Sequence, residues 1–555
     1  MARKIPLLTM AGKPGFVTAW YVLGPFRSGC ADGENVQFLD PKHTKYWEAD
    51  LLKSAGGEEN CRPRSGAVVR AQGLERKWKP VEVRYFHCLE IEKVSEQDSA
   101  LKAWMQKETK SKWWNVYDSI NYAAAYIYSS KAVDARVYAG GWDGYRLWVN
   151  GVFAGEDHTW HHQILDQDNY TVSLKKGLNL FLVKTDRSRL MLRLTDAGGL
   201  PLKGVYSVLP DATEKNTVLM GGETSSDPLN VLRKLAWTHK PKMQAPVPAG
   251  KAKILSWQKY FREELERIFL LKDRPRGRIQ IKKISSEDKG EYIREKLEFR
   301  REGLFSRFTA FLLLPKKRNG AAMVALHGHG GDKTAVSTLP ATPVRNSMNH
   351  EYGVHFAKRG YVTICIDAIG FAERETKGFD NCTCLNLGAN LLGRDLFSWD
   401  LYDYMTLVDY LSARKDVDKK RIGCAGVSFG GTSAYMLAAL DKRISACITS
   451  CAVTSFKEYL QEIGDSTCGS QSFYGIYKYG DISDVLSLIA PRPLFIEAGR
   501  LDYCFSVHFA EETYTKIKKI YSVLGAPDKA GADFFLGGHK FNGERSFDWL
   551  DGNLS

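Results

Sequence analysis

The run Gly426-Val427-Ser428-Phe429-Gly430-Gly431 is the feature that most narrows the fold. It matches G-x-S-x-G, in which a serine sits on a strained turn between a strand and a helix with its hydroxyl exposed. The flanks suit such a turn, because 421–425 is strand-like and 432–440 has the small and apolar side chains of a packed helix. A glycine-rich turn that holds a phosphate is the alternative, although no lysine follows as a P-loop requires.

A serine on such a turn needs a base and a carboxylate, which follow it in the order Ser, Asp or Glu, His. The base takes the proton of the serine hydroxyl, and the carboxylate fixes the tautomer of the base. Asp502 lies on a loop directly after the apolar stretch 493–499, and His539 follows the last strand-like stretch, 532–536. We therefore predict Ser428, Asp502 and His539 as a catalytic triad.

Rival residues remain for the acid and the base. Glu497 is the alternative acid, although it lies inside an apolar strand-like stretch, and Asp502 would then be a turn-forming aspartate. His508 competes with His539 only if the final strand is assigned wrongly.

An oxyanion hole is expected in the loop after an earlier strand. The apolar run 322–326 predicts a strand buried on both faces, and it ends in His327-Gly328-His329-Gly330-Gly331. We predict that the backbone N–H groups of Phe429 and His329 face the developing negative oxygen. Chelation of a metal by His327 and His329 is the alternative, but no third ligand is evident and the serine turn already explains the loop.

The segments between these motifs complete an open sheet. Buried strands are predicted at 361–367 and 445–452, and the apolar stripe within 399–412 has helical spacing. Strands that alternate with helices imply a doubly wound, mostly parallel α/β sheet.

Several motifs together carry a family resemblance. They are the glycine-rich loop 327–331, the stretch 367–374, Trp399-Asp400, the stretch 417–423, the serine turn 426–431 and Gly537-Gly538-His539. Over roughly residues 255–555 the chain resembles the acetyl-xylan-esterase and dienelactone-hydrolase-like branch of the α/β-hydrolases. The resemblance implies an α/β-hydrolase domain at 256–555 that cleaves esters without a cofactor. Phe429 departs from the glutamine that the better-known acetyl xylan esterases often carry there.

Residues 1–210 have a different pattern, with short strands rich in Trp, Tyr and Val and no strand–helix alternation. Asn150-Gly151 predicts a two-residue hairpin turn, and a second hairpin is expected around Lys175-Lys176-Gly177. The stretches 140–151 and 174–184 resemble jelly-roll modules of the carbohydrate-binding and protective-antigen-like kind. We therefore expect an all-β jelly-roll sandwich at 1–210, a linker rich in Pro, Lys, Gly and Thr at 211–255, and the α/β-hydrolase domain at 256–555.

Two groups of side chains within residues 1–210 are candidates for ligand binding. One group could stack on sugars, and comprises Trp142, Asp143, Trp148 and Trp160. Packing in the core or at a domain interface is the favoured interpretation of these aromatics. The other group could hold a metal, and comprises Asp157, His158, His161 and His162. Adjacent histidines in a strand point to opposite faces, so no metal site is predicted there.

Composition limits the class of protein. The 555 residues are 44% hydrophobic and 26% charged, as in globular proteins, and no run of 18 apolar residues predicts a membrane span. The start of the chain does not read as a signal peptide, so it is either cytoplasmic or exported with its signal absent from this sequence. The net charge of +14 comes from scattered Lys and Arg without nucleic-acid motifs. A preference for anionic substrates or surfaces is the minor alternative.

The eleven cysteines lack zinc-ribbon spacing. Four lie in predicted buried strands as small apolar groups, which suits a reducing compartment: Cys365, Cys424, Cys447 and Cys451. Cys382-Thr383-Cys384 is weak evidence for a metal, and a disulfide from either cysteine is expected only if the protein is exported. We predict no metal and no cofactor.

The leading functional hypothesis is a serine carboxylic-ester hydrolase that removes acetyl groups from acylated oligo- or polysaccharides, without nucleic-acid or membrane partners. The saccharide part rests on the resemblance and on the pairing of domains. Feruloyl esters, uronate esters or peptides cleaved with the same triad remain alternatives, as does a carbohydrate-binding protein with a vestigial hydrolase domain. The acyl group, the glycan and the oligomeric state stay open.

Overall fold

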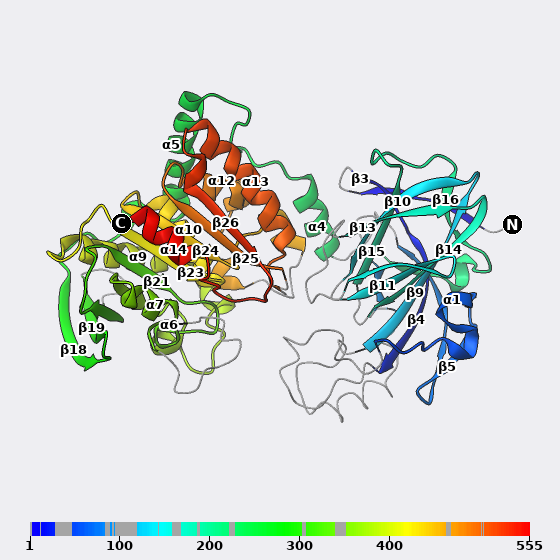
Figure 1. Cartoon of the computed structure of the whole chain (residues 1–555), viewed down its shortest axis with the longest axis horizontal. Helices are drawn as coiled ribbons and strands as arrows, with labels where there is room; N and C mark the ends of the chain where they lie inside the picture. The colour runs from blue at the N-terminus through cyan, green and yellow to red at the C-terminus, as the bar shows by residue number, and fades with distance from the viewer. Residues whose placement is uncertain are drawn as a thin grey trace. The chain divides into compact units, whose positions relative to one another are not determined.

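The computed structural model describes residues 3–10, 13–27, 47–83, 89–91, 94, 119–141, 144–157, 168–185, 189–220, 228–301, 307–338, 351–461, 468–500, 502 and 504–554. The chain divides into two compact units, Met1–Thr238 and His239–Ser555. The first unit is built mainly from strands, and the second combines a sheet with helices (Figure 1). Among the described residues, no helix is both long enough and apolar enough to cross a membrane.

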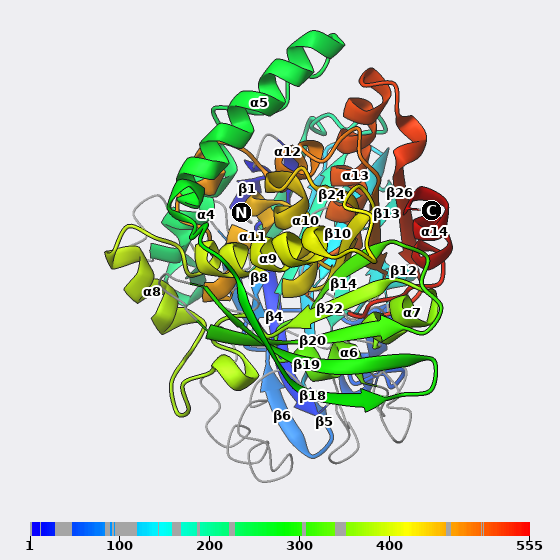
Figure 2. The same ribbon diagram turned by 90° about the vertical axis from the view of Figure 1, so that its left-hand side faces the viewer.

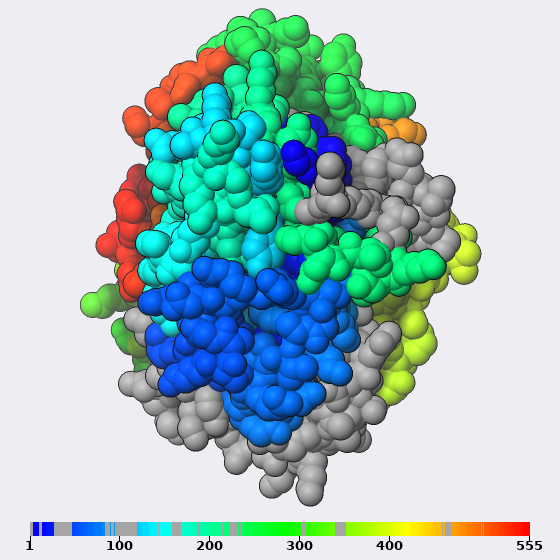
Figure 3. All heavy atoms as spheres, turned by 90° about the vertical axis from the view of Figure 1, so that its right-hand side faces the viewer, coloured from blue at the N-terminus to red at the C-terminus, as the bar shows by residue number. Residues whose placement is uncertain are grey.

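The first unit contains two large sheets and a small hairpin. The first sheet has the order β12 (Val152–Asp157), β11 (Tyr145–Val149), β14 (Gly177–Thr185), β9 (Ser119–Ser129), β4 (Ala19–Arg27), β7 (Lys79–Val83) and β17 (Val218–Met220), with β16 (Val205–Leu209) and β1 (Arg3–Pro6) branching from β9. The second has the order β13 (Asp168–Leu174), β10 (Val133–Gly141), β15 (Arg189–Thr195), β3 (Lys13–Phe16) and β2 (Leu8–Met10), with β8 (Leu89–Glu90) paired to β15. The hairpin pairs β5 (Val68–Ala71) with β6 (Leu74–Lys77). It belongs to residues 47–83, which form one continuous surface region drawn in blue in Figure 3.

Apolar side chains from both large sheets meet in a shared core. Phe181 of β14 and Leu147 of β11 join Val137 of β10 and Leu192 of β15 in one buried cluster. Successive strands from β9 to β16 switch repeatedly between the two sheets, as in a jelly-roll sandwich. The predicted all-β jelly-roll fold is therefore confirmed.

Local features of this unit follow the sequence pattern. Asn150 and Gly151 have φ values of 55° and 82°, which are the left-handed conformations that a type I′ hairpin turn requires. Trp148 is buried and contacts Phe153 edge to face with 5.8 Å between ring centroids, as expected for packing within the fold. The other proposed sugar-stacking and metal-binding residues, Trp142, Asp143, Trp160, His158, His161 and His162, lie outside the described residues.

The predicted linker 211–255 contains regular structure. Strand β17 pairs in parallel with β7, and Met220 contributes to the sandwich core. Helix α4 (Pro228–Thr238) follows, and helix α5 (Lys251–Ile268) begins before the predicted end of the linker. The exact bounds of the folding domains stay a prediction.

The second unit contains a nine-stranded sheet. Its order is β18 (Gln280–Asp288), β19 (Tyr292–Arg300), β20 (Arg307–Pro315), β22 (Val362–Ile366), β21 (Ala322–Leu326), β23 (Ile422–Val427), β24 (Ile444–Ser450), β25 (Leu494–Gly499) and β26 (Ala530–Phe535). Strands β18, β19, β20 and β22 lie side by side and antiparallel (Figure 2). From β22 to β26 the pairs are parallel.

Each face of the parallel sheet has its own apolar core. In β21, Val324 points into a cluster shared with α5, α9 (Leu396–Ala413), α10 (Phe429–Leu440), α12 (Ile482–Ser487) and α13 (Val507–Val523). Its neighbours Met323 and Ala325 point into the opposite cluster, shared with α6 (Lys333–Ser337), α7 (Tyr352–Lys358) and α14 (Ser546–Leu554). Helices on both faces of a mostly parallel sheet confirm the predicted doubly wound fold.

Candidate active site

Ser428 occupies the turn between β23 and α10. Its φ of 57° and ψ of −125° lie in a region that non-glycine residues rarely adopt, and its backbone N–H donates to the carbonyl of Ser450 at 2.9 Å. Strained backbone that the surrounding structure maintains is typical of functional sites. The turn has the conformation that a nucleophile elbow requires.

Glycines allow this turn to pack against the end of β21. A Cβ added at Gly430 would lie 1.9 Å from the carbonyl oxygen of Leu326, and one at Gly426 would lie 2.2 Å from the carbonyl oxygen of Gly430. Backbone atoms cannot yield to such contacts as a flexible side chain could. The two glycines therefore bring Ser428 next to the loop that follows Leu326.

Asp502 and His539 form a buried pair after β25 and β26. The imidazole Nδ1 lies 2.9 Å from each carboxylate oxygen of Asp502. Asp502 also accepts hydrogen bonds from the backbone N–H groups of Cys504 and Phe505 at 2.8 and 3.0 Å. Because Nδ1 donates to the carboxylate, Nε2 of neutral His539 is left as a proton acceptor.

The rival candidates have other contacts. Glu497 is buried in β25 and accepts the backbone N–H groups of Asn542 and Gly543, at 3.0 and 2.9 Å. Burial raises the pKa of this carboxyl. His508 lies on α13, where its Nε2 is 3.3 Å from a carboxylate oxygen of Glu512.

The glycine-rich loop after β21 is anchored through His327. The buried imidazole donates through Nδ1 to the carbonyl of Gly328 at 2.8 Å, and its Nε2 accepts the backbone N–H of Ala368 at 2.9 Å. Burial lowers the pKa of His327, which favours this neutral form. Both ring nitrogens of His327 bind backbone groups. His327 therefore does not chelate a metal together with His329 in this structure.

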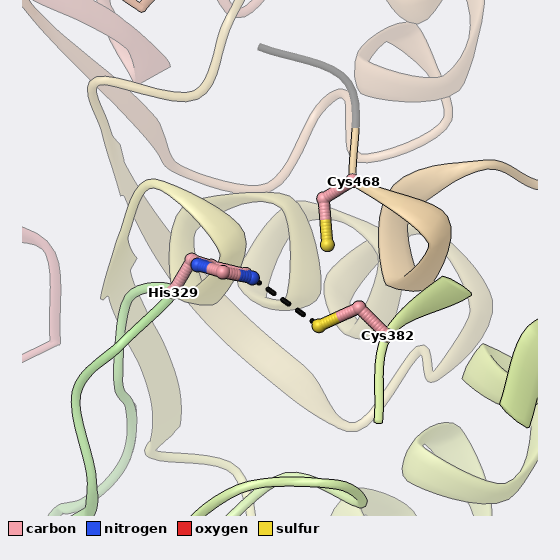
Figure 4. Close-up of side chains that lie close together, drawn as sticks. All are labelled: His329, Cys382 and Cys468. Carbon is pink, nitrogen blue, oxygen red and sulfur yellow. Dashed lines mark hydrogen bonds between the residues drawn. The ribbon is translucent and has the colours of Figure 1, made fainter. Parts of the chain in front are cut away.

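His329 instead faces two cysteines (Figure 4). Its Nε2 lies 3.2 Å from Sγ of Cys382, and the ligand atoms of His329, Cys382 and Cys468 all lie within 4.8 Å of one another. Hydrogen bonds from Cys468 and His329 lower the pKa of the Cys382 thiol below its ordinary value. Sequence reasoning missed Cys468, because no local spacing links it to residues more than 80 positions earlier.

Phe429 is a core residue as well as the residue after the serine. Its ring is fully buried, stacks on Phe371 with 5.6 Å between centroids, and meets Phe397 edge to face at 6.2 Å. Phe371 also contacts the His329 ring, at 5.2 Å. The aromatic side chain at position 429 therefore fits the apolar packing beneath the loop.

Other motif residues support the loop after β22. Asp400 accepts the backbone N–H of Ile369 at 2.8 Å, and burial raises its pKa to about 7. Arg374 bonds to the carboxylate of Asp403 and to the carbonyl of Asp367. These residues position backbone near the site.

The doubly wound sheet with its elbow between β23 and α10 defines an α/β-hydrolase fold. The model of the "Abhydrolase family" matches residues 227–536, more than half of the chain, and the chain belongs to this family. A Bacillus subtilis (strain 168) protein named "Putative hydrolase YtaP" is 28% identical over 266 residues, which are 47% of this chain and 87% of that protein.

Solved structures with a similar arrangement include a "putative acetyl xylan esterase" from Bacteroides fragilis NCTC 9343. It has a TM-score of 0.48 and 19% identity, and the match covers 59% of this chain and 84% of that one. A glucuronoyl esterase from Solibacter usitatus has a TM-score of 0.41 and 16% identity, over 56% of this chain and 96% of that one.

Proposed function

We propose that the protein is a serine carboxylic-ester hydrolase that removes acyl groups, acetyl foremost, from acylated oligo- or polysaccharides. The observation that carries the mechanism is the buried Asp502–His539 pair, combined with the strained elbow at Ser428. These three residues follow the chain order expected for the fold.

The reaction uses two acyl transfers. Nε2 of His539 takes the proton of the Ser428 hydroxyl as its oxygen attacks the ester carbonyl carbon. The C–O bond to the sugar then breaks, and His539 gives the proton to the departing oxygen, which leaves an acyl-enzyme. Water, deprotonated by His539, attacks the acyl carbon, releases the carboxylic acid and restores Ser428. Asp502 keeps the imidazole in the required tautomer and stabilises its charged form.

The negative oxygen of each tetrahedral intermediate needs hydrogen-bond donors. Phe429 is the first residue of α10, so its N–H has no partner within the helix and lies at the positive end of the helix dipole. The second donor in this proposal is the backbone N–H of His329, in the loop that Gly430 brings close to the elbow.

Support for a saccharide substrate comes from the presence of both units in one chain. An all-β sandwich, whose sequence resembles carbohydrate-binding jelly-roll modules, precedes the hydrolase in one chain. The association of the two units supports a saccharide substrate, and the ester panel below decides it.

A panel of esters tests the proposal. Chromogenic acetate, ferulate and methyl-uronate esters, acetylated xylo-oligosaccharides and a peptide are compared by kcat/KM, and a fluorophosphonate probe reports the reactive serine. We expect labelling and a preference for acetyl esters. A preference for ferulate esters, uronate esters or the peptide would change the assigned substrate class and leave the catalytic triad assignment intact. A folded protein that resists the probe and cleaves none of the substrates would favour a binding protein with a vestigial hydrolase domain.

A further inference from the structure

Three metal-ligating side chains converge beside the glycine-rich loop, on segments that are distant in sequence (Figure 4). His329 comes from the loop after β21, Cys382 from the turn before α8 (Thr383–Leu391), and Cys468 from the turn before the short helix Gly469–Gln471. The imidazole and both thiols point toward a common centre in the close-up view.

The separations suit one tetrahedral ion. Zinc bonds of about 2.3 Å to sulfur and 2.1 Å to nitrogen place neighbouring ligand atoms about 3.6–3.8 Å apart. Here Nε2 of His329 and Sγ of Cys382 are 3.2 Å apart, and all three ligand atoms lie within 4.8 Å of one another. Small side-chain rotations thus bring them to coordination distance.

Side chains from neighbouring residues bind the backbone at both cysteines. Asp380 accepts the N–H groups of Cys382 and Thr383 at 3.1 and 2.9 Å, and the N–H of Cys468 donates to the hydroxyl of Tyr459 at 2.9 Å. The two segments touch directly, because a Cβ at Gly469 would lie 2.6 Å from the carbonyl oxygen of Cys382. The thiol-bearing segments are therefore preorganised with respect to each other.

We propose that His329, Cys382 and Cys468 bind a soft divalent metal ion of the Zn²⁺ type. Two thiolates and one imidazole are the donor set that such ions prefer over oxygen-seeking Mg²⁺ or Ca²⁺. His329 is exposed and both cysteines are half-buried, so an ion reaches the site from solvent. Three protein ligands leave a fourth position for water or another small ligand.

Such an ion would tie the glycine-rich loop to the segments at 382 and 468. The link continues toward the elbow, because the Phe371 ring contacts both His329 and Phe429. The site does not depend on the proposed esterase chemistry. A bound ion would act as a positioning device for the loop, and its binding is measurable whether or not the protein cleaves esters.

The test uses the full chain, reduced and freed of metal, with Co²⁺ as a spectroscopic probe. We expect a saturable thiolate-to-cobalt charge-transfer band at one ion per chain, which Zn²⁺ abolishes by displacement. Cys382→Ser, Cys468→Ser and His329→Gln should each weaken binding at least about 10-fold. Cys384→Ser is the matched control, since this exposed thiol lies two residues from Cys382, outside the cluster, and should bind as the unaltered protein does.

A second measurement avoids dependence on variant folding. In the unaltered protein, Zn²⁺ should protect Cys382 and Cys468 from alkylation, read by peptide mass spectrometry, while Cys384 stays reactive. Absence of both the cobalt band and this protection in the reduced chain would overturn the proposal. So would a Cys382–Cys468 disulfide in protein purified without reductant, if the reduced form then fails to bind Co²⁺. Equal binding by the three ligand variants and the Cys384 control would also overturn it.

Discussion

The carboxylate of Glu497 accepts the backbone N–H of Gly543 at 2.9 Å, four residues beyond His539 in the chain. Glu497 is fully buried, and that burial raises its pKa. It therefore holds the loop that carries His539, whereas Asp502 contacts the imidazole itself. The two acids that compete in the sequence have different structural tasks.

Matched amide substitutions separate those tasks. Asp502→Asn should lower kcat by about 10²–10⁴-fold, because the amide no longer fixes the imidazole tautomer. Glu497→Gln should chiefly lower the melting temperature, through weaker acceptance of the Asn542 and Gly543 N–H groups, with kcat within about 10-fold of the original. Ester kinetics and thermal unfolding of both variants check this. The reverse pattern would show that the acid has been misplaced.

Removal of the proposed nucleophile should abolish turnover and spare the fold. Ser428→Ala deletes one hydroxyl at a position whose backbone conformation alanine can share, so we expect kcat to fall at least about 10³-fold with little change in melting temperature. Fluorophosphonate labelling should disappear in parallel. Ser445→Ala is the control, because Ser445 bonds to the carbonyl of Lys420 at the start of β24. Near-original esterase activity in Ser428→Ala would refute the assignment.

The parts of the fold that the sequence predicted are those that depend on local patterns. Strands such as β21 and β22 are nearly continuous apolar runs because both faces of a parallel sheet are buried. The G-x-S-x-G run specifies its own turn through the close approach of Gly430 to Leu326. The loops that carry the proposed catalytic residues Asp502 and His539 follow directly from strand ends, where ligands of an open α/β sheet bind.

The parts that were missed depend on contacts between distant segments. The cluster of His329, Cys382 and Cys468 forms only when three loops meet, so no spacing in the sequence signals it. The short strand β17 is hidden in a polar stretch and is fixed by its pairing with β7. Both features depend on tertiary contacts, which local sequence patterns do not reveal.

Close packing at the elbow predicts a severe folding defect in Gly430→Ala. The new Cβ would lie 1.9 Å from the Leu326 carbonyl oxygen, so the elbow or β21 must shift. We expect a loss of at least about 2 kcal/mol in the free energy of unfolding, measured by urea denaturation. Gly388→Ala is the matched control, because this glycine lies within α8 and a Cβ there meets nothing within 4 Å. That substitution should stabilise the protein by about 0.4–1 kcal/mol. Equal effects at the two positions would contradict the packing argument.

Asp395 should make stability fall as pH rises. Its buried carboxyl accepts the backbone N–H of Tyr474 at 2.8 Å, and burial raises its pKa to about 6. The unfolded chain releases this proton near its ordinary pKa of about 4, so the folded state holds more protons between about pH 4 and 6. The protonated Asp395 therefore stabilises the folded state fully below about pH 4, and this contribution is lost as pH rises to about 6. Asp395→Asn should therefore gain stability relative to the original protein as pH rises, by up to about 3 kcal/mol.

An oppositely shifted acid provides the control for this pH dependence. Burial would raise the pKa of Asp416, but hydrogen bonds and charge from Arg414 outweigh it and lower the pKa. Asp416→Asn should thus lose stability relative to the original protein as pH rises from the folded pKa of Asp416 to the ordinary aspartate pKa of about 4, and the difference should stay constant above it. Melting temperatures of both variants between about pH 2 and 8 give the comparison, since the Asp416 window lies below about pH 4 and the Asp395 window above it. Parallel slopes for the two variants would contradict the assigned directions.

The first unit should fold by itself and contribute to substrate binding rather than to ester cleavage. Because β17 pairs with β7 and Met220 lies in the sandwich core, the fragment to express is 1–238 rather than 1–210. We expect it to unfold cooperatively and to show no esterase activity, since Ser428, Asp502 and His539 lie in the other unit. If the sandwich binds sugar, its deletion should raise KM on acetylated polymer by more than on a small acetate ester. Equal changes on both substrates, with the remaining unit folded, would assign the sandwich a structural role and contradict the sugar-stacking interpretation of Trp142, since Trp148 is already buried within the fold.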